Sequence, residues 1–326
     1  MSRSEIPSAG KIAKVTCIGG GVIGAGWAAH FMRAGLDVVV YDTAAERESY
    51  LRESLAKAMP ALIELGMAPS ASPSRVRFTT NFEEALDGAN FVQESATENI
   101  DAKIALIARI DANTAPDVVI ASSSSGFLAA HLRSRAQRGE RILIGHPFNP
   151  PFLVPLVEIA GGEGARQAAA DASAFYRSTG CEVVELEREI DGYIGNRIQY
   201  AVLREVLYLM SQGVADLEAI DRAIAAGPAI RWAVMGPSSV FFLGARDPSL
   251  YGKFVEGLDR EMKSGYMAPA SFQPDAELMQ AYAEQVKSSI GVDGQARLMA
   301  LRDVGVVGIR GVLQRARVKL DGSHSR

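Results

Sequence analysis

The stretch Val15-Thr-Cys-Ile-Gly-Gly-Gly-Val-Ile-Gly24 decides the fold of this chain. It begins with apolar residues typical of a buried strand and leads into Trp27-Ala-Ala-His-Phe-Met-Arg33, which is typical of a helix. Three of its glycines have the G-x-G-x-x-G spacing that lets a backbone turn sharply and approach a pyrophosphate at a helix N-terminus. The stretch therefore predicts a dinucleotide site. Its cofactor-binding residues are expected to be Gly19, Gly21, Val22, Ile23 and Gly24.

An acidic residue at the end of the next predicted strand strengthens this interpretation. Asp42 ends the run Asp37-Val-Val-Val-Tyr-Asp42 and follows Gly19 at close to the roughly 20-residue spacing of a carboxylate that binds a ribose 2′-hydroxyl. A glycine-rich turn in another kind of α/β protein is the alternative. No arginine immediately follows Asp42, so the sequence favours NAD over NADP.

The size and charge of the chain are those of a soluble protein with two domains. It has 326 residues, and 48% of them are hydrophobic, which suffices for a substantial core. The formal net charge is only −4 and the basic residues are scattered. We therefore expect no binding to nucleic acid or to an anionic membrane surface. No apolar run approaches membrane-spanning length.

The cysteine content indicates a reducing compartment. Cys17 and Cys181 are the only cysteines, which are too few for a disulfide framework or a metal cluster. Residues 1–10 lack the apolar core of a signal peptide. We therefore expect a cytoplasmic protein without a metal site.

Strand-like and helix-like segments alternate over the first part of the chain, as in a doubly wound parallel α/β sheet. The predicted strands are 15–18, 38–41, 76–79, 91–94, 118–121, 142–144, 154–159 and 182–186. The helix-like segments include 44–65, 82–86 and 103–111. After residue 190 the apolar residues take helical spacing, with a terminal helix over 298–314 and a frayed tail from residue 315. The chain is therefore expected to form a Rossmann-type NAD-binding domain, residues 1–190, and an all-helical C-terminal domain, residues 191–326.

Polar residues follow three of the predicted strands, at the edge where such sheets bind their ligands. The first strand end precedes Glu98 and Lys103, the second precedes Ser122-Ser-Ser-Ser125, and the third precedes His146. A neutral imidazole is the usual group for taking a hydroxyl proton near pH 7. His146 is therefore a candidate general base, with a hydrogen-bonded structural role as the alternative. The other histidines fall in predicted helices, where a partly exposed structural role is expected, or in the tail: His30, His131 and His324.

Glu158 and Asn196 are two further candidates. Apolar neighbours on both sides of Glu158 imply burial, and a buried carboxylate needs a partner. That partner is either His146, whose imidazolium form it would stabilise, or a basic side chain elsewhere. Asn196 begins the first predicted helix of the second domain. It either caps that helix or hydrogen-bonds substrate, and local sequence does not choose.

At these residues, over nearly its whole length, the chain resembles the 3-hydroxyacyl-CoA dehydrogenase family. The matching segments include the glycine loop, His146-Pro-Phe-Asn-Pro150 and Gly192-Tyr-Ile-Gly-Asn196. The resemblance implies NAD-dependent oxidation of a secondary 3-hydroxyl and a homodimer formed through the second domain. The implied catalytic residues are the base His146, its orienting carboxylate Glu158, and Ser125 and Asn196 as hydrogen-bond partners of the substrate. The implied cofactor contacts, besides the glycine loop, are Asp42, Glu98, Lys103, Ser125 and Asn149.

Two departures from the family pattern bear on the substrate. The segment 43–90 holds few basic residues and looks short for the basic helical hairpin that holds CoA phosphates, and the C-terminus lacks the family's glycine- and lysine-rich signature. Both features resemble the branch that contains carnitine dehydrogenase and gulonate 3-dehydrogenase. We therefore expect a small free L-3-hydroxy acid as substrate, with a 3-hydroxyacyl-CoA thioester as the alternative. A third alternative is an NAD-binding structural protein, because that branch includes a lens crystallin.

A small free hydroxy acid needs its own anchoring residues. Arg197 and Arg231 are candidates for bidentate capture of a carboxylate, with a surface or structural role as the alternative for each. The quaternary ammonium of carnitine would need an aromatic wall, for which Phe148, Tyr193 and Trp232 are the nearest candidates. Ordinary core packing is the alternative for these three rings.

Overall fold

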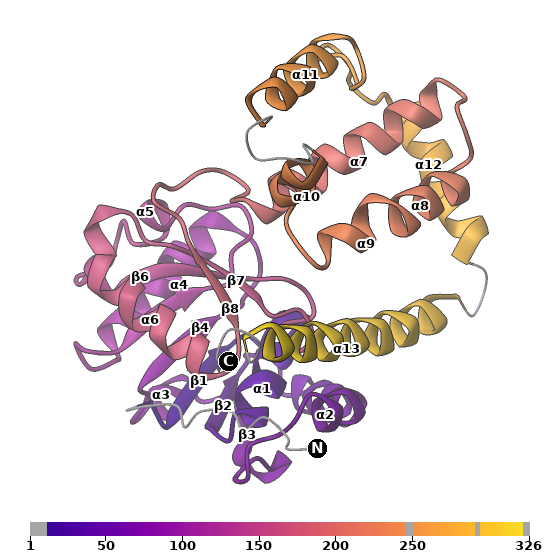
Figure 1. Ribbon diagram of the computed structural model, residues 1–326. Coiled ribbons are helices and arrows are strands. Elements are labelled where there is room, and N and C mark those ends of the chain that lie inside the picture. Colours follow the sequence, from indigo (N-terminus) through magenta and orange to yellow (C-terminus); the bar gives the residue numbers. More distant parts are fainter. Residues whose placement is uncertain (1–11, 245–250, 291–293, 322–326) are drawn as a thin grey trace. The chain divides into compact units, whose positions relative to one another are not determined.

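The computed structural model describes residues 12–244, 251–290 and 294–321. The chain divides into two compact units, Met1–Asn196 and Arg197–Arg326. The first is an α/β unit, and the second is built from helices (Figure 1).

The first unit contains an eight-stranded sheet with the order β3-β2-β1-β4-β5-β6-β7-β8. All the predicted strands are present, and the Rossmann-type class is confirmed. From β3, at one edge of the sheet, the chain passes back over β2 and β1 and forms β4 on the other side of β1. The strand order therefore reverses between β1 and β4, and doubly wound sheets bind their ligands at such a reversal. The strands are β1 (Lys14–Ile18), β2 (Asp37–Tyr41), β3 (Val76–Thr79), β4 (Phe91–Glu94), β5 (Val119–Ser122), β6 (Ile142–Pro147), β7 (Leu156–Ala160) and β8 (Glu182–Glu185).

One strand pairing differs from the parallel sheet that the sequence predicts. Strand β7 runs antiparallel to β6, whereas the other neighbouring strands pair in parallel. The connection 148–155 is too short for a crossover helix, which takes a dozen or more residues, so the chain returns directly along β6. This pairing places His146 opposite Glu158 in register.

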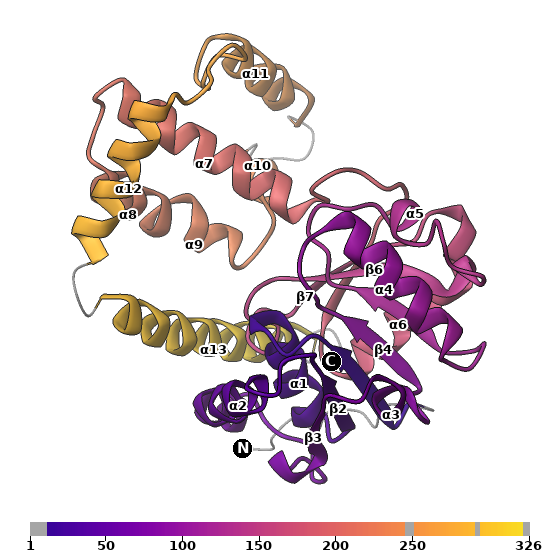
Figure 2. The same cartoon turned by 180° about the vertical axis from the view of Figure 1, so that it is seen from behind.

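Helices cover both faces of this sheet (Figure 2). Alternate residues of β2 show the two faces: Val40 belongs to a core cluster with residues of α1, α2 and α6, and Val39 to a cluster with residues of α3 and α4. Burial on both faces explains the continuous apolar runs of the strands. The helices are α1 (Val22–Arg33), α2 (Arg47–Glu64), α3 (Phe82–Leu86), α4 (Ile100–Ala112), α5 (Ala129–Leu132) and α6 (Arg166–Ser178), with short 3₁₀ turns at Pro73–Arg75, Gly139–Arg141 and Glu163–Ala165.

The second unit contains helices and no strand within the residues described, as expected. Its small core joins α7, α8 and α12 through Val206, Leu217 and Ile220, with Tyr282 and Val286 packed against them. The terminal helix continues to residue 321, past the predicted end at 314, because 315–321 contains several good helix formers. Within the described residues, no helix is long and apolar enough to cross a membrane. The helices are α7 (Gly195–Ser211), α8 (Leu217–Ala226), α9 (Pro228–Trp232), α10 (Pro237–Gly244), α11 (Tyr251–Lys263), α12 (Ala276–Ile290) and α13 (Gly294–Asp321).

Candidate active site

The three glycines of the G-x-G-x-x-G loop have different surroundings. Gly19 has φ +102°, and a Cβ atom added to it would lie 2.6 Å from the carbonyl oxygen of Ser95. A Cβ atom on Gly24 would collide with the carbonyl oxygen of Gly19. Gly21, by contrast, has no atom within 4 Å of an added Cβ. Packing therefore requires the first and third glycines, and the second leaves open space beside the backbone.

This open space lies at the N-terminus of α1. The helix begins at Val22 and carries no acidic side chain in its first turn, so its own residues do not neutralise the positive end of the helix dipole. The backbone N–H groups of the first turn of a helix have no intrahelical partner. The residues present therefore fit a bound pyrophosphate, as dinucleotide-binding sheets hold it.

Asp42 is tied to the same loop. Its Oδ2 atom accepts a hydrogen bond from the Gly20 backbone N–H at 2.7 Å, and its Oδ1 atom accepts one from the Ala44 N–H at 3.1 Å. The carboxylate thus lies at the carboxyl end of β2, next to the glycine loop. This is where a carboxylate that binds the ribose of a dinucleotide is expected.

His146 and Glu158 form a buried pair on the adjacent strands β6 and β7. The Nδ1 atom of His146 lies 3.0 Å from Oε2 of Glu158, and the two residues are 5% and 1% exposed. The other carboxylate oxygen, Oε1, accepts backbone hydrogen bonds from Ile194 and Gly195, each at 2.9 Å. Of the two partners that the sequence left open for Glu158, the structure provides His146.

These contacts decide the charge of the Glu158 carboxyl group. Burial acts most strongly and would raise its pKa. The hydrogen bonds from His146 and from the Gly195 and Ile194 N–H groups act in the opposite direction and together outweigh burial. The pKa of Glu158 therefore lies below its ordinary value, and the group is a carboxylate at neutral pH. A carboxylate on Nδ1 orients the imidazole and stabilises its protonated form.

Two aromatic rings flank the imidazole of His146. The Phe148 ring meets it edge to face with a centroid distance of 5.6 Å, and the Tyr193 ring lies at 5.1 Å. Phe148 is partly exposed. Tyr193 is fully buried, and its hydroxyl donates a hydrogen bond to the carbonyl oxygen of Phe127 at 2.6 Å. The Tyr193 ring therefore packs in the protein core, which is the alternative that the sequence left open for it.

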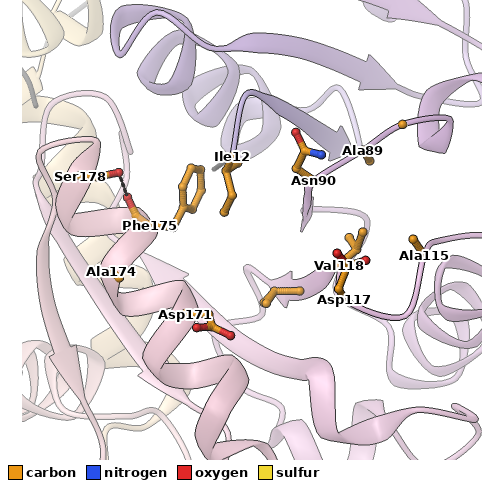
Figure 3. A pocket seen from close by; sticks show the side chains of 12 residues that line it. Ile12, Ala89, Asn90, Ala115, Asp117, Val118, Asp171, Ala174, Phe175 and Ser178 are labelled. Atoms are coloured by element: carbon orange, nitrogen blue, oxygen red, sulfur yellow. Dashed lines mark hydrogen bonds between the residues drawn. The ribbon is translucent and has the colours of Figure 1, made fainter. Parts of the chain in front are cut away.

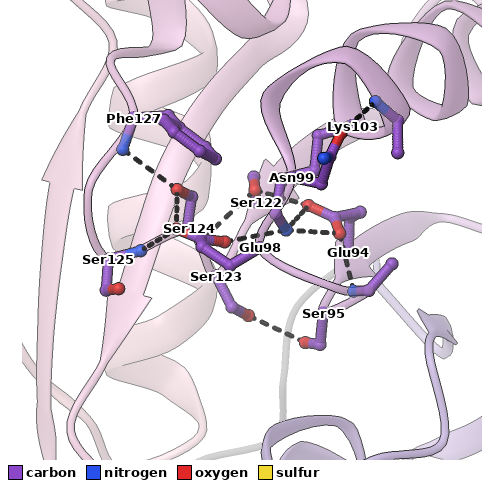
Figure 4. Close-up of polar contacts among 12 residues, drawn as sticks. Glu94, Ser95, Glu98, Asn99, Lys103, Ser122, Ser123, Ser124, Ser125 and Phe127 are labelled. Carbon is purple, nitrogen blue, oxygen red and sulfur yellow. Dashed lines mark hydrogen bonds and ion pairs between the residues drawn. The ribbon is translucent and has the colours of Figure 1, made fainter.

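A polar network links the ends of β4 and β5 (Figure 4). Oε1 of Glu98 accepts hydrogen bonds from the Ser124 hydroxyl at 2.6 Å and from the Ser125 backbone N–H at 3.0 Å. The Lys103 ammonium lies 3.4 Å from the other oxygen of Glu98 and 2.7 Å from Oε1 of Glu94. The network therefore holds residues Ser122–Ser125, the serine loop, in place.

Glu94 is a residue of this site that the sequence analysis missed. It is 0% exposed, and Lys103, which was predicted to contact the cofactor, is 1% exposed and is paired with it. The Ser122 hydroxyl and the Ala96 N–H also donate to the Glu94 carboxylate. A carboxylate in an otherwise uncharged, buried strand, the feature that also pointed to Glu158, was the signal that could have identified it.

Asn196 contacts the serine loop and does not cap a helix. Helix α7 begins at Gly195, so Asn196 lies inside its first turn. Its Nδ2 atom donates to the carbonyl oxygen of Ser125 at 3.3 Å. The structure therefore brings Asn196 and Ser125 together.

The remaining predicted residues are placed differently. Asn149 is exposed in the loop after β6. Three candidates for substrate binding, Arg197, Arg231 and Trp232, are exposed residues of the second unit, and their roles remain predictions.

The other histidines lie outside this site. His30 is 1% exposed, not partly exposed as expected, because its Nε2 atom lies 2.9 Å from the Thr179 hydroxyl inside the core of the first unit. His131 is exposed on α5, and His324 lies outside the described residues. Within the described part of the chain, no three His, Cys, Asp or Glu side chains are grouped so as to hold a metal ion.

A cavity of about 920 Å³ lies at the amino ends of strands β4 and β5, whereas the glycine loop follows the carboxyl end of β1 (Figure 3). The residues that line this cavity include Ile12, Asn90, Val118 and Phe175 and two acidic residues, Asp117 and Asp171. It shares no residue with the glycine loop or with the His146–Glu158 pair.

Comparison with known proteins connects this geometry to one family. Residues 14–190 match the NAD binding domain of 3-hydroxyacyl-CoA dehydrogenase, and residues 192–272 match the C-terminal domain of that family. The chain is 42% identical to the L-carnitine dehydrogenase of Nocardiopsis dassonvillei, over 92% of this chain and 91% of that protein. It is 41% identical to the L-carnitine dehydrogenase of Streptomyces coelicolor, over 91% of this chain and 93% of that protein.

A solved structure is similar over nearly the whole chain. It is the NAD⁺-dependent dismutase 5-formyl-3-hydroxy-2-methylpyridine 4-carboxylic acid 5-dehydrogenase, with a TM-score of 0.81 and 30% identity. The match covers 93% of this chain and 99% of that one.

Proposed function

Because this chain belongs to the 3-hydroxyacyl-CoA dehydrogenase family, we propose that it oxidises the 3-hydroxyl group of a small free L-3-hydroxy acid, with His146 as the general base. The enzyme is an NAD-dependent oxidoreductase that acts on CH–OH groups. L-Carnitine is the first substrate to test, and L-gulonate is the second.

The observation that carries this proposal is the buried hydrogen bond between His146 and Glu158. With Nδ1 directed to a carboxylate, Nε2 is the ring nitrogen left to accept a proton from the substrate hydroxyl. The positive charge that then appears on the imidazole is stabilised by Glu158. Held at the glycine loop, NAD would supply the acceptor for the hydride of the same carbon atom. In the reverse direction the imidazolium returns the proton to the oxygen.

Other side chains of the site have supporting roles in this proposal. Ser125 is an exposed residue in the loop after β5, and we expect its hydroxyl to hydrogen-bond the reacting oxygen. The Asn196 amide, in contact with Ser125, would position the substrate. The glycine loop, Asp42, Glu98 and Asn149 would hold the cofactor, and Lys103 would act through its contact with Glu98.

The substrate proposal rests on the relatives and on the residues that are available for recognition. Both relatives described above are named L-carnitine dehydrogenase. Arg197 and Arg231 are the candidate anchors for a carboxylate, and the partly exposed Phe148 and exposed Trp232 are the candidate aromatic contacts for a quaternary ammonium.

A substrate panel tests this choice. The purified enzyme with NAD is given L-carnitine, L-gulonate or 3-hydroxybutyryl-CoA, and NADH formation is followed by absorbance. We expect kcat/KM to be highest for one of the two free acids. A higher kcat/KM for the CoA thioester, or absence of turnover with both free acids, would reject the free-acid proposal.

We also propose that the enzyme is a homodimer formed through its second unit. Large apolar side chains are exposed there, among them Ile198 and Tyr200 on α7 and Leu301, Val304 and Val312 on α13. Exposed apolar surface of this kind marks protein interfaces. Light scattering coupled to gel filtration should give twice the mass of the chain, and Val304→Glu should lower it. A wild-type monomer at micromolar concentration would contradict the proposal.

A further inference from the structure

Tyr193 has an unusual backbone conformation next to the site. Its φ is +51°, and among the described residues no other non-glycine residue has a positive φ. The preceding residue, Gly192, has φ +75°. A bulky side chain in the left-handed region is strained, and such strain persists only where the surrounding structure enforces it.

This turn sets the direction of the two backbone N–H groups that follow it. The Ile194 and Gly195 N–H groups both reach Oε1 of Glu158 at 2.9 Å. They leave Oε2 for His146. The conformation of Tyr193 therefore helps to hold the carboxylate in the orientation that the imidazole needs.

The side chain of Tyr193 contacts two further parts of the site. Its ring lies against the imidazole of His146, at a centroid distance of 5.1 Å. Its hydroxyl donates to the Phe127 carbonyl oxygen at 2.6 Å, and the Phe127 N–H in turn donates to the Ser124 hydroxyl. Because burial raises the pKa of the phenol, the hydroxyl keeps its proton and remains a donor. One residue thus touches the base, is linked to the Ser124 hydroxyl through Phe127, and directs the N–H groups that hold the carboxylate.

From these contacts we infer that Tyr193 is a positioning residue for the reaction. It holds the His146 imidazole and the Glu158 carboxylate in a fixed position relative to the serine loop. The inference rests on the proposed role of His146. Glycine or asparagine would adopt the same backbone conformation with less strain. A tyrosine at this position therefore needs a reason in its side chain, and its ring and hydroxyl contacts supply one.

Two variants separate the contribution of the Tyr193 hydroxyl from that of its ring. Tyr193→Phe keeps the ring and removes the hydrogen bond to Phe127. Tyr193→Asn keeps a residue that tolerates a positive φ but removes the ring. We expect Tyr193→Phe to lower kcat about threefold to tenfold, the effect of one lost hydrogen bond, and Tyr193→Asn to lower it further. We expect both to leave the Kd for NAD, measured by calorimetry, within about twofold of wild type, because the side chain of Tyr193 contacts His146 and Phe127, neither of which is a proposed cofactor-binding residue.

Thr16→Val is the matched control, because Thr16 is also fully buried and its hydroxyl donates to a backbone carbonyl oxygen, that of Ala85, at 2.6 Å. Each variant is assayed well below its Tm, which is measured separately. The control should lose thermal stability and keep kcat. If Tyr193→Phe and Tyr193→Asn both keep wild-type kcat, or if Thr16→Val loses as much kcat as Tyr193→Phe, the inference is wrong. If Tyr193→Asn does not fold, Tyr193→Phe decides alone.

The variant His146→Ala separates this inference from the proposed function. Turnover by His146→Ala at the wild-type rate would remove the general base and, with it, both proposals. An inactive His146→Ala together with unchanged Tyr193 variants would remove only the role of Tyr193.

Discussion

His146 and Glu158 lie opposite each other in the antiparallel pair of β6 and β7, with 3.0 Å between Nδ1 and Oε2. Directly opposite residues in such a pair project their side chains to the same face. Strand register, together with the two backbone N–H groups that hold Oε1, therefore brings the candidate base and its carboxylate together.

The first prediction concerns the charge of Glu158. Glu158→Gln keeps the size of the side chain but removes the negative charge beside the imidazole. We expect kcat to fall about tenfold to a hundredfold, the range for a hydrogen bond to a charged group, while NAD binding persists. Steady-state kinetics with a calorimetric titration of NAD measure both effects. An unchanged kcat would remove Glu158 from the mechanism.

The second prediction concerns stability in acid. Burial opposes the charge of Asp111, but its hydrogen bonds from Arg141 and from the Gln137 and Arg138 N–H groups outweigh this, and its pKa, like that of Glu158, is below the ordinary value. A carboxyl group whose pKa is lower in the folded than in the unfolded state stabilises the fold above the unfolded pKa of about 4. This stability is lost as the pH falls through the folded pKa. The free energy of unfolding in urea should therefore fall between pH 5 and pH 3.

The variant Asp111→Asn provides the control for the acid effect. It should be less stable at pH 7 and should show a shallower loss on acidification, because one of the linked carboxyl groups is gone. An equally steep pH dependence in the variant and the wild type would show that Asp111 is not one of the groups responsible.

The third prediction concerns the close contact between the Phe148 ring and Gly195, the first residue of α7. A Cβ atom added to Gly195 would lie 2.5 Å from Cε2 of Phe148, whose ring also meets His146. Gly195→Ala should therefore displace the ring and lower kcat, although alanine favours helix formation. Gly305→Ala is the control, since a Cβ atom there would meet nothing within 4 Å. Equal kcat values for the two variants would show that the ring moves aside without effect.

The fourth prediction separates two glycines of the cofactor loop. Gly21→Ala adds a methyl group to open space, so it should leave the Tm nearly unchanged and raise the KM for NAD about tenfold or more, because the methyl group occupies the path of the pyrophosphate. Gly19→Ala should lower the Tm, because of its φ of +102° and the nearby Ser95 oxygen. Thermal melts and NAD titrations measure the two effects. If Gly21→Ala left the KM for NAD unchanged, the assignment of this space to the cofactor would be wrong.

Much of the fold could be predicted because its signals are local. The strands of the sheet are short apolar runs between turn residues, and each of the predicted strands is present. The direction of β7 was not predicted, because it depends on what the connection 148–155 allows and not on the apolar pattern. The extension of α13 to residue 321 does not follow from the sequence pattern, because the polar residues after 314 fit a frayed tail as well as a helix.

The site was predicted less completely because pairing through space leaves little trace in a sequence. Burial of Glu158 was expected, but the choice of His146 as its partner required the β6–β7 register. Glu94 and Lys103 pair across the end of a strand and the helix that follows, which spacing alone did not indicate. The sequence suggested the Tyr193 ring as a ligand contact. In the structure the residue is buried, has a positive φ and packs against His146.

The most direct measurement of the central claim is kcat for L-carnitine oxidation by His146→Ala, beside His131→Ala as a matched control on the exposed face of α5. The loss of a general base predicts a fall in kcat of about a hundredfold or more for His146→Ala, with NAD affinity retained and with His131→Ala at the wild-type rate. If His146→Ala oxidised the substrate at the wild-type rate, His146 would not be the base, and the proposed mechanism would be wrong.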